Sequence, residues 1–209
     1  MAYRLARIFG TEEDKVNCAF YYKIGACRHG DRCTRLHNKP LLSQTVLLKN
    51  MYVNPAPALA LAEGKWIWKI GQEIPEEILK ETIRHFEDFY EEVFIELVKY
   101  GEVEELNVCD NIGEHIVGNV YVKYYNEEDA KKAYSALNGR YYAGRQINAE
   151  YSPVTDFREA KCRQFDQGCC ERGGYCNFMH LKHVSRTFKR SLFREMYDKN
   201  PEFWKQKKE

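Results

Sequence analysis

Residues 18–37 read CAFYYKIGACRHGDRCTRLH, and residues 162–180 read CRQFDQGCCERGGYCNFMH. Each stretch holds three cysteines and one histidine, spaced C-x8-C-x5-C-x3-H in the first and C-x7-C-x5-C-x3-H in the second. Three thiolates and one imidazole complete a tetrahedral Zn²⁺ shell and leave no position for a substrate. The matched spacings therefore predict two structural CCCH modules and two Zn²⁺ per chain, rather than disulfides. The predicted ligands are Cys18, Cys27, Cys33, His37, Cys162, Cys170, Cys176 and His180.

The second module offers a neighbouring cysteine as an alternative ligand. Choosing Cys169 instead of Cys170 would give spacings of x6 and x6 and break the match with the first module. Cys109 and Cys169 are then expected to be free thiols that pack or lie on the surface. His29 lies between two ligands, and we expect it to face a loop or an RNA rather than to bind metal.

Between the modules, residues 43–153 carry a β-α-β-β-α-β pattern. The first strand is expected at 46–51, and a long helix at 75–100 has Pro75 at its start and Gly101 beyond its end. The apolar residues of this helix, from Phe86 to Leu97, recur at intervals of one and three and are predicted to form its buried side. A hairpin follows, with strands at 103–109 and 115–125. The predicted second helix spans 127–138, and the last strand spans 146–151. The fold class is therefore α+β, an RRM-like domain flanked by two small CCCH zinc fingers.

The RRM-like pattern lacks most of the rings that stack on RNA bases. Residues 118–124 read GNVYVKY, which puts Asn119 at the first stacking position of the third strand and leaves only Tyr121. Leu47 stands where the first strand would carry a ring. Base stacking contributes about 1–3 kcal/mol per base. The central sheet is therefore predicted to bind protein rather than RNA.

Charge is distributed in three blocks. Residues 1–49 and 156–209 each carry a net charge of +5, whereas residues 50–155 carry ten Lys/Arg against nineteen Asp/Glu, a net of −9. A polyanion is attracted to the ends, and a basic protein segment to the middle. Acidic residues gather on the polar side of the long helix, and an Arg-Tyr-Tyr loop follows the second helix. These residues are Glu87, Asp88, Glu91, Glu92, Glu96, Arg140, Tyr141 and Tyr142.

Four segments are expected along the chain: zinc finger 1 at 12–40, the RRM-like domain at 43–153, zinc finger 2 at 156–183 and a helical tail at 184–209. The sequence holds no apolar run approaching the roughly 20 residues that span a bilayer. A soluble intracellular protein without a membrane partner is therefore expected.

The motifs together resemble the small subunit of the U2 snRNP auxiliary factor, a heterodimer that marks 3′ splice sites in pre-mRNA. The resemblance extends from residue 1 to about 183. It rests on KVNCAFYYKIGACRHGDRC at 15–33, GNVYVK at 118–123, SPVTDFREA at 152–160 and CNFMH at 176–180. It implies a U2AF homology motif in the middle and a nuclear splicing factor. Residues 52–74, with Trp66 and Trp68, stand apart as an insertion, and the tail after Phe188 is not Arg/Ser-rich.

The resemblance also implies two binding surfaces. The zinc modules together would bind the AG dinucleotide at the intron end, and the central domain would bind a Trp-containing peptide of the large subunit. The RNA candidates are aromatic, basic and polar residues of the modules: Phe20, Tyr22, Arg28, Thr34, Arg35, Arg158, Arg163, Gln164, Phe165 and Phe178. The partner candidates are Glu92, Glu96, Arg140, Tyr141 and Tyr142, with tyrosines where many members have Trp and Phe.

Three other functions are compatible with parts of the sequence. A scaffold would use zinc only to brace the central domain and would bind no RNA. Another CCCH-type RNA-binding regulator would share the spacings but not the peptide-binding centre. A metalloenzyme conflicts with closed zinc shells and with the lack of a paired-acid or Cys-His motif, so no catalytic residue is predicted.

Overall fold

The computed structural model describes residues 16–56 and 75–205, so most of the predicted insertion, including Trp66 and Trp68, lies outside the described residues. The helices are α3 (Ala19–Ile24), η1 (Gly30–Arg32), α5 (Glu76–Val98), α6 (Glu127–Leu137), α7 (Phe157–Ala160), α8 (Arg163–Asp166), η2 (Gly173–Tyr175), α9 (Arg186–Lys199) and α10 (Glu202–Lys205). The strands are β1 (Thr45–Lys49), β2 (Val103–Cys109), β3 (Val120–Tyr124), β4 (Tyr141–Tyr142), β5 (Arg145–Gln146), β6 (Asn148–Tyr151) and β7 (Leu181–Lys182).

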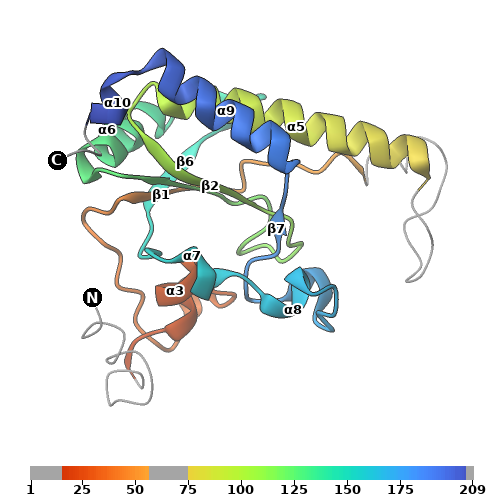
Figure 1. Ribbon diagram of the computed structural model, residues 1–209. Coiled ribbons are helices and arrows are strands. Elements are labelled where there is room, and N and C mark those ends of the chain that lie inside the picture. The colour runs from red at the N-terminus through yellow and green to blue at the C-terminus, as the bar shows by residue number, and fades with distance from the viewer. Residues whose placement is uncertain (1–15, 57–74, 206–209) are drawn as a thin grey trace.

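The main sheet has the strand order β6-β1-β3-β2-β7, and every neighbouring pair is antiparallel (Figure 1). Its first four strands with α5 and α6 make the predicted β-α-β-β-α-β arrangement, so the predicted fold class is confirmed. The fifth strand, β7, directly follows the predicted zinc ligand His180 and pairs with the end of β2. The second zinc module is thus tied to one edge of the sheet.

One face of the sheet packs against α5 and α6. The apolar stripe predicted on the long helix is buried, from Phe86 to Leu97. It meets Val46, Val108 and Val122 of the strands in one core. Burial of a large apolar side chain contributes about 1.5–3 kcal/mol, so this face carries the main stabilising contacts of the domain.

The segment between β2 and β3 differs from the predicted hairpin. A strand was expected from residue 115, but residues 113–118 form turns, with the Val117 amide donating to the Gly113 carbonyl at 2.8 Å. Gly118 has φ +60°, and a Cβ there would lie 2.0 Å from the Tyr52 carbonyl oxygen. The chain therefore turns until Gly118, and β3 begins only at Val120. At the other end, Gln146, predicted to begin the last strand, belongs to β5, and the last strand of the sheet, β6, begins at Asn148.

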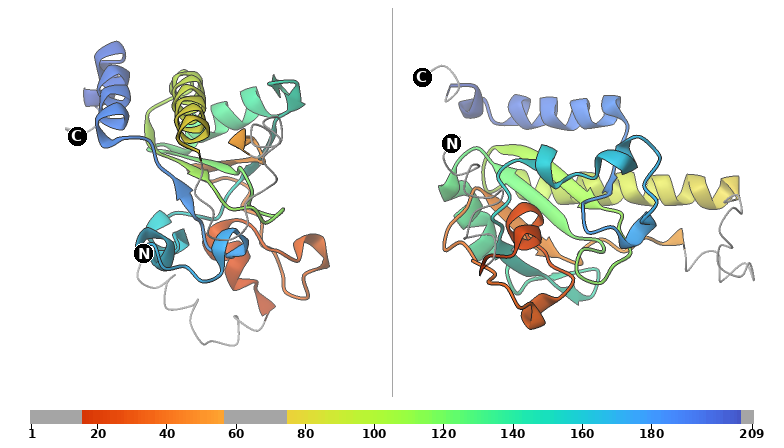
Figure 2. Two further views of the ribbon diagram at one scale, coloured as in Figure 1. Left: turned by 90° about the vertical axis from the view of Figure 1, so that its right-hand side faces the viewer. Right: turned by 90° about the horizontal axis from the view of Figure 1, so that it is seen from below.

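The predicted helical tail is part of the domain. α9 lies alongside α5 (Figure 2), and Leu192, Met196 and Phe203 enter the same core as the sheet. The Tyr197 hydroxyl donates a 2.7 Å hydrogen bond to the buried Glu102 carboxylate at the end of the α5–β2 turn. Within the described ranges, none of the helices is both long and apolar enough to cross a membrane.

The opposite face of the sheet, here called the finger-side face, is covered by the two zinc modules. Figure 2 shows α3 and α8 on the side of the sheet away from α5. Leu47 and Tyr121, at the stacking positions of an RRM, are 1% and 0% exposed. Both belong to a second core with Ile24, Phe157 and Met179 from the modules. The surface that reads RNA in other RRMs is therefore buried within this chain.

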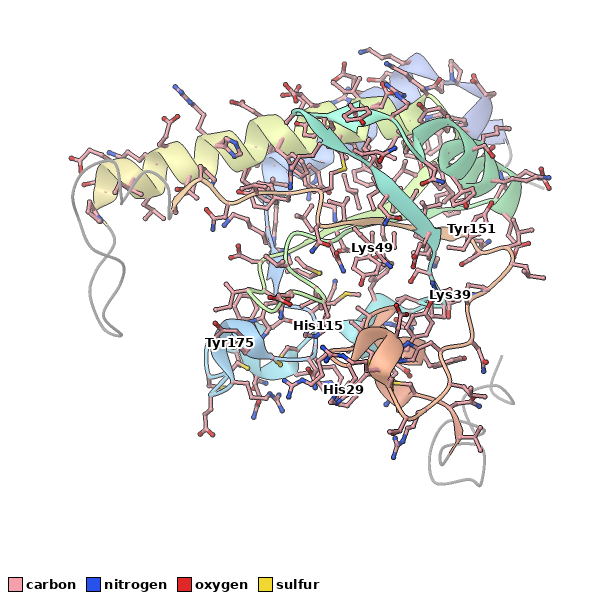
Figure 3. All side chains as sticks on the ribbon, turned by 180° about the vertical axis from the view of Figure 1, so that it is seen from behind. His29, Lys39, Lys49, His115, Tyr151 and Tyr175 are labelled. Atoms are coloured by element: carbon pink, nitrogen blue, oxygen red, sulfur yellow. The ribbon has the colours of Figure 1, made fainter. Side chains whose placement is uncertain are left out.

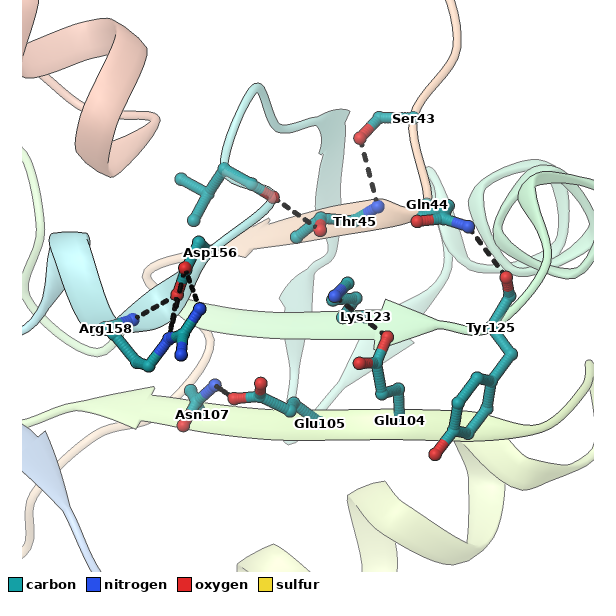
Figure 4. A network of polar contacts seen from close by, with 11 residues as sticks. Ser43, Gln44, Thr45, Glu104, Glu105, Asn107, Lys123, Tyr125, Asp156 and Arg158 are labelled. Carbon is teal, nitrogen blue, oxygen red and sulfur yellow. Dashed lines mark hydrogen bonds and ion pairs between the residues drawn. The ribbon is translucent and has the colours of Figure 1, made fainter. Parts of the chain in front are cut away.

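Beyond the modules, the finger-side face carries paired polar side chains (Figure 4). Lys123 of β3 lies 2.9 Å from a Glu104 oxygen of β2, and the Asn107 amide donates to Glu105 at 3.1 Å. Asn119, at the vacant stacking position, is 1% exposed and accepts the Asn50 amide at 2.9 Å. Neither part of this face offers an aromatic platform.

Candidate metal centres and nucleic-acid interface

Each set of predicted ligands converges on one point. The ligand atoms of Cys18, Cys27, Cys33 and His37 lie within 4.8 Å of one another, as do those of Cys162, Cys170, Cys176 and His180. The Cys162 sulfur is 3.7 Å from that of Cys170 and 3.8 Å from that of Cys176. Sulfurs about 2.3 Å from a tetrahedral Zn²⁺ are separated by about 3.8 Å. Cys169 lies outside the group, exposed, with its thiol toward Gln167.

The histidines give an independent test of the metal fit. The Nε2 atoms of His37 and His180 are buried and have no hydrogen-bond partner in the described structure. A buried nitrogen without a partner carries a desolvation penalty of roughly 1–3 kcal/mol. Each histidine also has a ring nitrogen within 4.8 Å of three cysteine sulfurs, and nitrogen with sulfur is the donor set that Zn²⁺ prefers. The residues therefore fit zinc.

The two modules repeat one backbone design; residues 16–37 are called finger 1 and residues 161–180 finger 2. In finger 1 the Cys18 amide donates to Leu36, and in finger 2 the Cys162 amide donates to Met179, both at 2.9 Å. Gly25 and Gly168 each stand two residues before the second ligand with φ near +70°. A turn of this kind requires a residue that tolerates positive φ, which explains the shared glycine.

An aromatic ring stacks on the ligand histidine in each finger. Tyr21 lies 4.5 Å from His37 with the rings 9° from parallel, and Phe165 lies 4.0 Å from His180 at 12°. Both aromatics stand three residues after the first cysteine. Phe165, predicted to stack on RNA, thus has one face against its own zinc ligand.

Finger 2 is held by the end of β2. The Asn111 side chain donates to the carbonyls of Cys176 and Phe178 at 3.1 and 3.0 Å, and it accepts the His180 amide at 2.8 Å. The Asp110 amide donates to the His180 carbonyl at 2.7 Å. Finger 1 is held instead from β3, because the Tyr121 hydroxyl donates to the Ile24 carbonyl at 2.7 Å.

The two fingers also touch each other. Arg28 of finger 1 donates from Nε to the Asn177 side chain at 2.9 Å and from Nη2 to the Tyr175 carbonyl at 3.3 Å. The rings of Phe20 and Phe178 meet edge to face, with centroids 6.1 Å apart. On the rear of the molecule, His29, His115 and Tyr175 lie along this seam (Figure 3). The fingers thus form one continuous surface.

A groove of about 330 Å³ opens on this surface and is called the finger groove. Its lining holds five cations, one carboxylate and one aromatic ring. The lining residues are Lys23, Arg158, Glu159, Lys161, Cys162, Arg163, Gln164, Arg172 and Phe178. The Arg172 guanidinium donates to Gln164 at 2.9 Å and lies 6.0 Å from the Phe178 ring centroid. Clustered cations beside flat groups suit single-stranded nucleic acid.

The predicted RNA candidates fall into three groups. Arg158, Arg163, Gln164 and Phe178 line the finger groove, and Phe20 adjoins it through Phe178. Arg28 bridges the fingers instead, and Phe165 packs on His180. The remaining candidates, which are exposed on finger 1 outside the groove lining, are Tyr22, Thr34 and Arg35.

Sequence reasoning missed several groove residues. Lys23 ends α3, Lys161 precedes the first ligand of finger 2, and Arg172 occupies the position that His29 holds in finger 1. Superposing the two Cys₃His spacings would have drawn attention to Arg172, two residues after the second ligand. No comparable signal marks Lys23 or Glu159, because the groove forms between segments distant in sequence.

The five partner candidates line a second, smaller cavity of about 60 Å³, here called the Arg140 pocket. The Arg140 guanidinium lies 2.6 Å from a Glu96 oxygen, and the Tyr142 hydroxyl donates to Glu92 at 2.8 Å. Tyr141 is 70% exposed at the rim. Apolar side chains such as Leu48 and Leu97 complete the lining. The sequence missed Tyr100, whose hydroxyl contacts both Glu96 and Arg140.

Charge pairing sets the protonation of this pocket. Hydrogen bonds from Lys99 first, then from Arg140 and Tyr100, lower the pKa of Glu96 to about 2. Burial, followed by the neighbouring Glu92 carboxylate, raises the pKa of Tyr142 to about 12. Glu96 is therefore ionised and Tyr142 neutral at physiological pH.

Two family models match the chain. Residues 13–39 match the zinc finger C-x8-C-x5-C-x3-H type (and similar), and residues 69–148 match the RNA recognition motif. The second match begins after β1, which the structure adds to the sheet. Both matches agree with the observed elements.

Curated relatives match nearly the whole chain. The splicing factor U2af 38 kDa subunit of Drosophila melanogaster is 57% identical over 194 residues, which is 92% of this chain and 71% of that protein. The splicing factor U2AF 26 kDa subunit of Rattus norvegicus is 57% identical, covering 92% of this chain and 84% of that protein. A splicing factor U2af small subunit of Arabidopsis thaliana is 56% identical over 92% of this chain and 65% of its own length. On these matches, the chain belongs to the small-subunit family of the splicing factor U2AF.

Proposed function

We propose that this chain is a nuclear, non-enzymatic splicing-factor subunit that reads the AG dinucleotide at 3′ splice sites through its two fingers. Each finger holds one Zn²⁺, and the metal supplies the folding energy that orders the finger. The proposed division of the chain has four segments: a zinc-finger segment at 12–40 that contains finger 1, the RRM-like domain at 43–153, a zinc-finger segment at 156–183 that contains finger 2, and the tail at 184–209.

The burial of Tyr121 carries this proposal. A fully buried ring cannot stack on a base, so the sheet is excluded as the reader of RNA. The exposed cations and the Phe178 ring of the finger groove remain as the alternative binding surface. Single-stranded RNA is read through stacking and base-edge hydrogen bonds, and the groove offers groups for both.

The second half of the proposal concerns the partner. The Arg140 pocket combines two carboxylates with an apolar floor and an exposed ring, Tyr141. An indole from the large subunit would enter beside these apolar groups, and basic residues flanking it would meet the acidic face of α5. A Trp-containing peptide of the large subunit is therefore the proposed occupant.

The test is a titration of zinc-loaded protein with short RNAs ending in UAG or UAC, with and without the partner peptide. Preferential binding of UAG is expected, and Arg163→Ala, which removes a cation of the groove lining, should reduce it. Arg32→Ala serves as a control, because Arg32 is exposed on finger 1 and lies outside the groove lining. Equal binding of UAG and UAC would favour a general CCCH RNA-binding regulator. No RNA binding with or without the peptide would favour a scaffold.

A further inference from the structure

The finger groove contains one acidic side chain among five cations. Glu159 belongs to α7, a short helix whose Phe157 and Ala160 are 1% and 0% exposed beneath the groove. The Phe157 ring meets Tyr121 edge to face at 5.9 Å, which fixes α7 to the sheet. The backbone at Glu159 is therefore held in place by the packing of α7 on the sheet.

Among the described residues, the Glu159 carboxylate has no hydrogen-bonding partner, whereas Arg158 and Arg172 of the same lining each have one. Arg158 is paired with Asp156 through its Nε and Nη2 atoms, the shortest contact being 2.6 Å, and Arg172 donates to Gln164. Among the described residues, no hydrogen bond or ion pair involves the Glu159 carboxylate; only its backbone amide is bonded, to Asp156. In the described structure, the Glu159 carboxylate is therefore a hydrogen-bond acceptor in the groove that receives no hydrogen bond from a protein side chain.

As a charge alone, Glu159 opposes RNA binding. The groove attracts phosphates through Lys161, Arg163 and the other cations, and a carboxylate within it weakens that attraction. The carboxylate becomes favourable only where it accepts hydrogen bonds from donors of the ligand. Such charge-assisted bonds are stronger than neutral ones, particularly when two form in parallel.

The chemistry of the four bases selects one of them. A carboxylate is an acceptor with two oxygens. Guanine presents two adjacent donors, N1–H and the N2 amine, on its Watson–Crick edge. Adenine and cytosine each set one amine beside an acceptor nitrogen, and uracil sets one N–H between two carbonyls. Only guanine offers two parallel donors to a carboxylate without an opposing acceptor.

We propose that Glu159 is the specificity-determining acceptor for guanine in the finger groove and binds the N1–H and N2 amine of the base. The inference rests on the proposed reading of AG by the fingers and assigns the guanine of that dinucleotide to this groove. The flat Phe178 ring lines the same groove and would contact the base, and Lys161 and Arg163 of the lining would contact phosphate.

The experiment compares three RNAs that differ only in the last base of the trinucleotide: UAG, UAA and UAI, where I is inosine. Inosine keeps N1–H but lacks the N2 amine. Fluorescence anisotropy on wild-type, zinc-loaded protein should rank them UAG, UAI, UAA in decreasing affinity. Loss of one bond to a charged group corresponds to a decrease on the order of tenfold. Inosine binding as tightly as guanosine would overturn the proposal without any variant.

Two substitutions then assign the effect to Glu159. Glu159→Gln should lower the affinity for UAG by about tenfold and leave that for UAA unchanged or higher, because a negative charge is removed. Glu159→Asp keeps the charge but shortens the side chain by one carbon, and it should also lower the UAG-to-UAA ratio. Glu171→Gln is the control: Glu171 is an exposed carboxylate of finger 2 outside the groove lining, and its substitution should preserve that ratio.

The outcomes separate this inference from the proposed function. If Glu159→Gln tightens binding of all three RNAs by the same factor, Glu159 is only a repulsive neighbour and the inference is wrong. If wild-type protein prefers UAG but the variants keep that preference, the inference fails and the reading of AG stands. If wild-type protein binds all RNAs equally, the proposed function itself fails, and the inference with it.

Discussion

The Tyr121 hydroxyl on β3 donates a 2.7 Å hydrogen bond to the Ile24 carbonyl at the end of α3, 97 positions earlier in the sequence. Tyr121 is the last aromatic left at an RRM stacking position, and it now supports finger 1 from beneath. The bond joins the sheet to the finger that the sheet positions. A variant that loses this hydrogen bond but keeps the ring can therefore distinguish a structural role of Tyr121 from a role in binding bases.

Tyr121→Phe should lower the free energy of unfolding by about 1–3 kcal/mol, because a buried hydrogen bond is lost while the ring remains. Tyr121→Ala should cost about 3–5 kcal/mol through the cavity it leaves. Urea unfolding followed by circular dichroism measures both. Tyr141→Phe, at an exposed ring, should change little. A folded Tyr121→Phe protein that has lost RNA binding would contradict the structural role.

Metal analysis of the purified protein should return two zinc ions per chain. Cys170→Ser should reduce this to about one, because it removes a ligand from the second Cys₃His group, whereas Cys169→Ser should leave two. Zinc released by a chelator, detected with a colorimetric dye, provides the count. The opposite behaviour of the two variants would show that Cys169 is the ligand.

Arg28→Ala should weaken RNA binding without changing the zinc content. The substitution removes both hydrogen bonds across the seam between the fingers, so their relative orientation loosens. A decrease in affinity of roughly tenfold is expected from two exposed hydrogen bonds of about 0.5–1.5 kcal/mol each. Arg32→Ala, on the same finger, is the matched control. Equal affinities for the two variants would argue against a shared finger surface.

Glu92→Lys and Glu96→Lys should weaken binding of a Trp-containing partner peptide and leave the zinc content unchanged. Each substitution reverses a charge in the Arg140 pocket, and the second also breaks the contact with Arg140. Because the Glu96 pKa is about 2, below its ordinary 4.5, the stabilisation from its ionised form is complete above about pH 4.5 and is lost as the pH falls toward 2. Calorimetric titration should therefore find no Glu96-dependent change in peptide affinity between pH 5 and 8.

The salt dependence of RNA affinity should identify the groove cations that contact phosphate. For single strands, the logarithm of affinity falls with the logarithm of salt by about 0.7 for each phosphate contact. Lys161→Ala and Arg163→Ala should each reduce the slope by about that amount. Lys182→Ala is the control, since its ammonium lies 3.3 Å from Asp110 on the β2 side of β7. If the two variants keep the wild-type salt slope, Lys161 and Arg163 do not contact the RNA phosphates.

Local patterns were sufficient for the parts of the fold that depend on neighbouring residues. The apolar spacing from Phe86 to Leu97 predicted the buried side of α5, and the cysteine spacing predicted both ligand groups, including the choice of Cys170. The start of β3 was wrong by five residues, because Val117 and His115 look strand-like while the turn that holds them depends on Gly118 meeting Tyr52.

The binding surface was predicted only in part, because it depends on contacts between distant segments. Leu47 and Asn119 in the sequence were enough to predict that the sheet lacks stacking rings. The sequence did not predict that the fingers bury this face of the sheet. β7 is two residues long and has no periodicity of its own. Phe165 has the aromatic character of a base-stacking residue, but its ring packs on His180, a contact that the sequence spacing does not reveal.

The seam between Arg28 and Asn177 has a consequence for how the protein is made. A nascent chain grows at about 5–20 residues per second, so roughly 7–30 s separate the synthesis of these two partners. Soon after that interval begins, all four ligands of finger 1 have been synthesised, but finger 2 stays incomplete until the interval has ended. A chain interrupted before residue 177 therefore holds one complete metal shell and no groove. If the fingers bind RNA as proposed, only chains synthesised as far as His180 can form the complete binding surface, because His180 is the last ligand of finger 2.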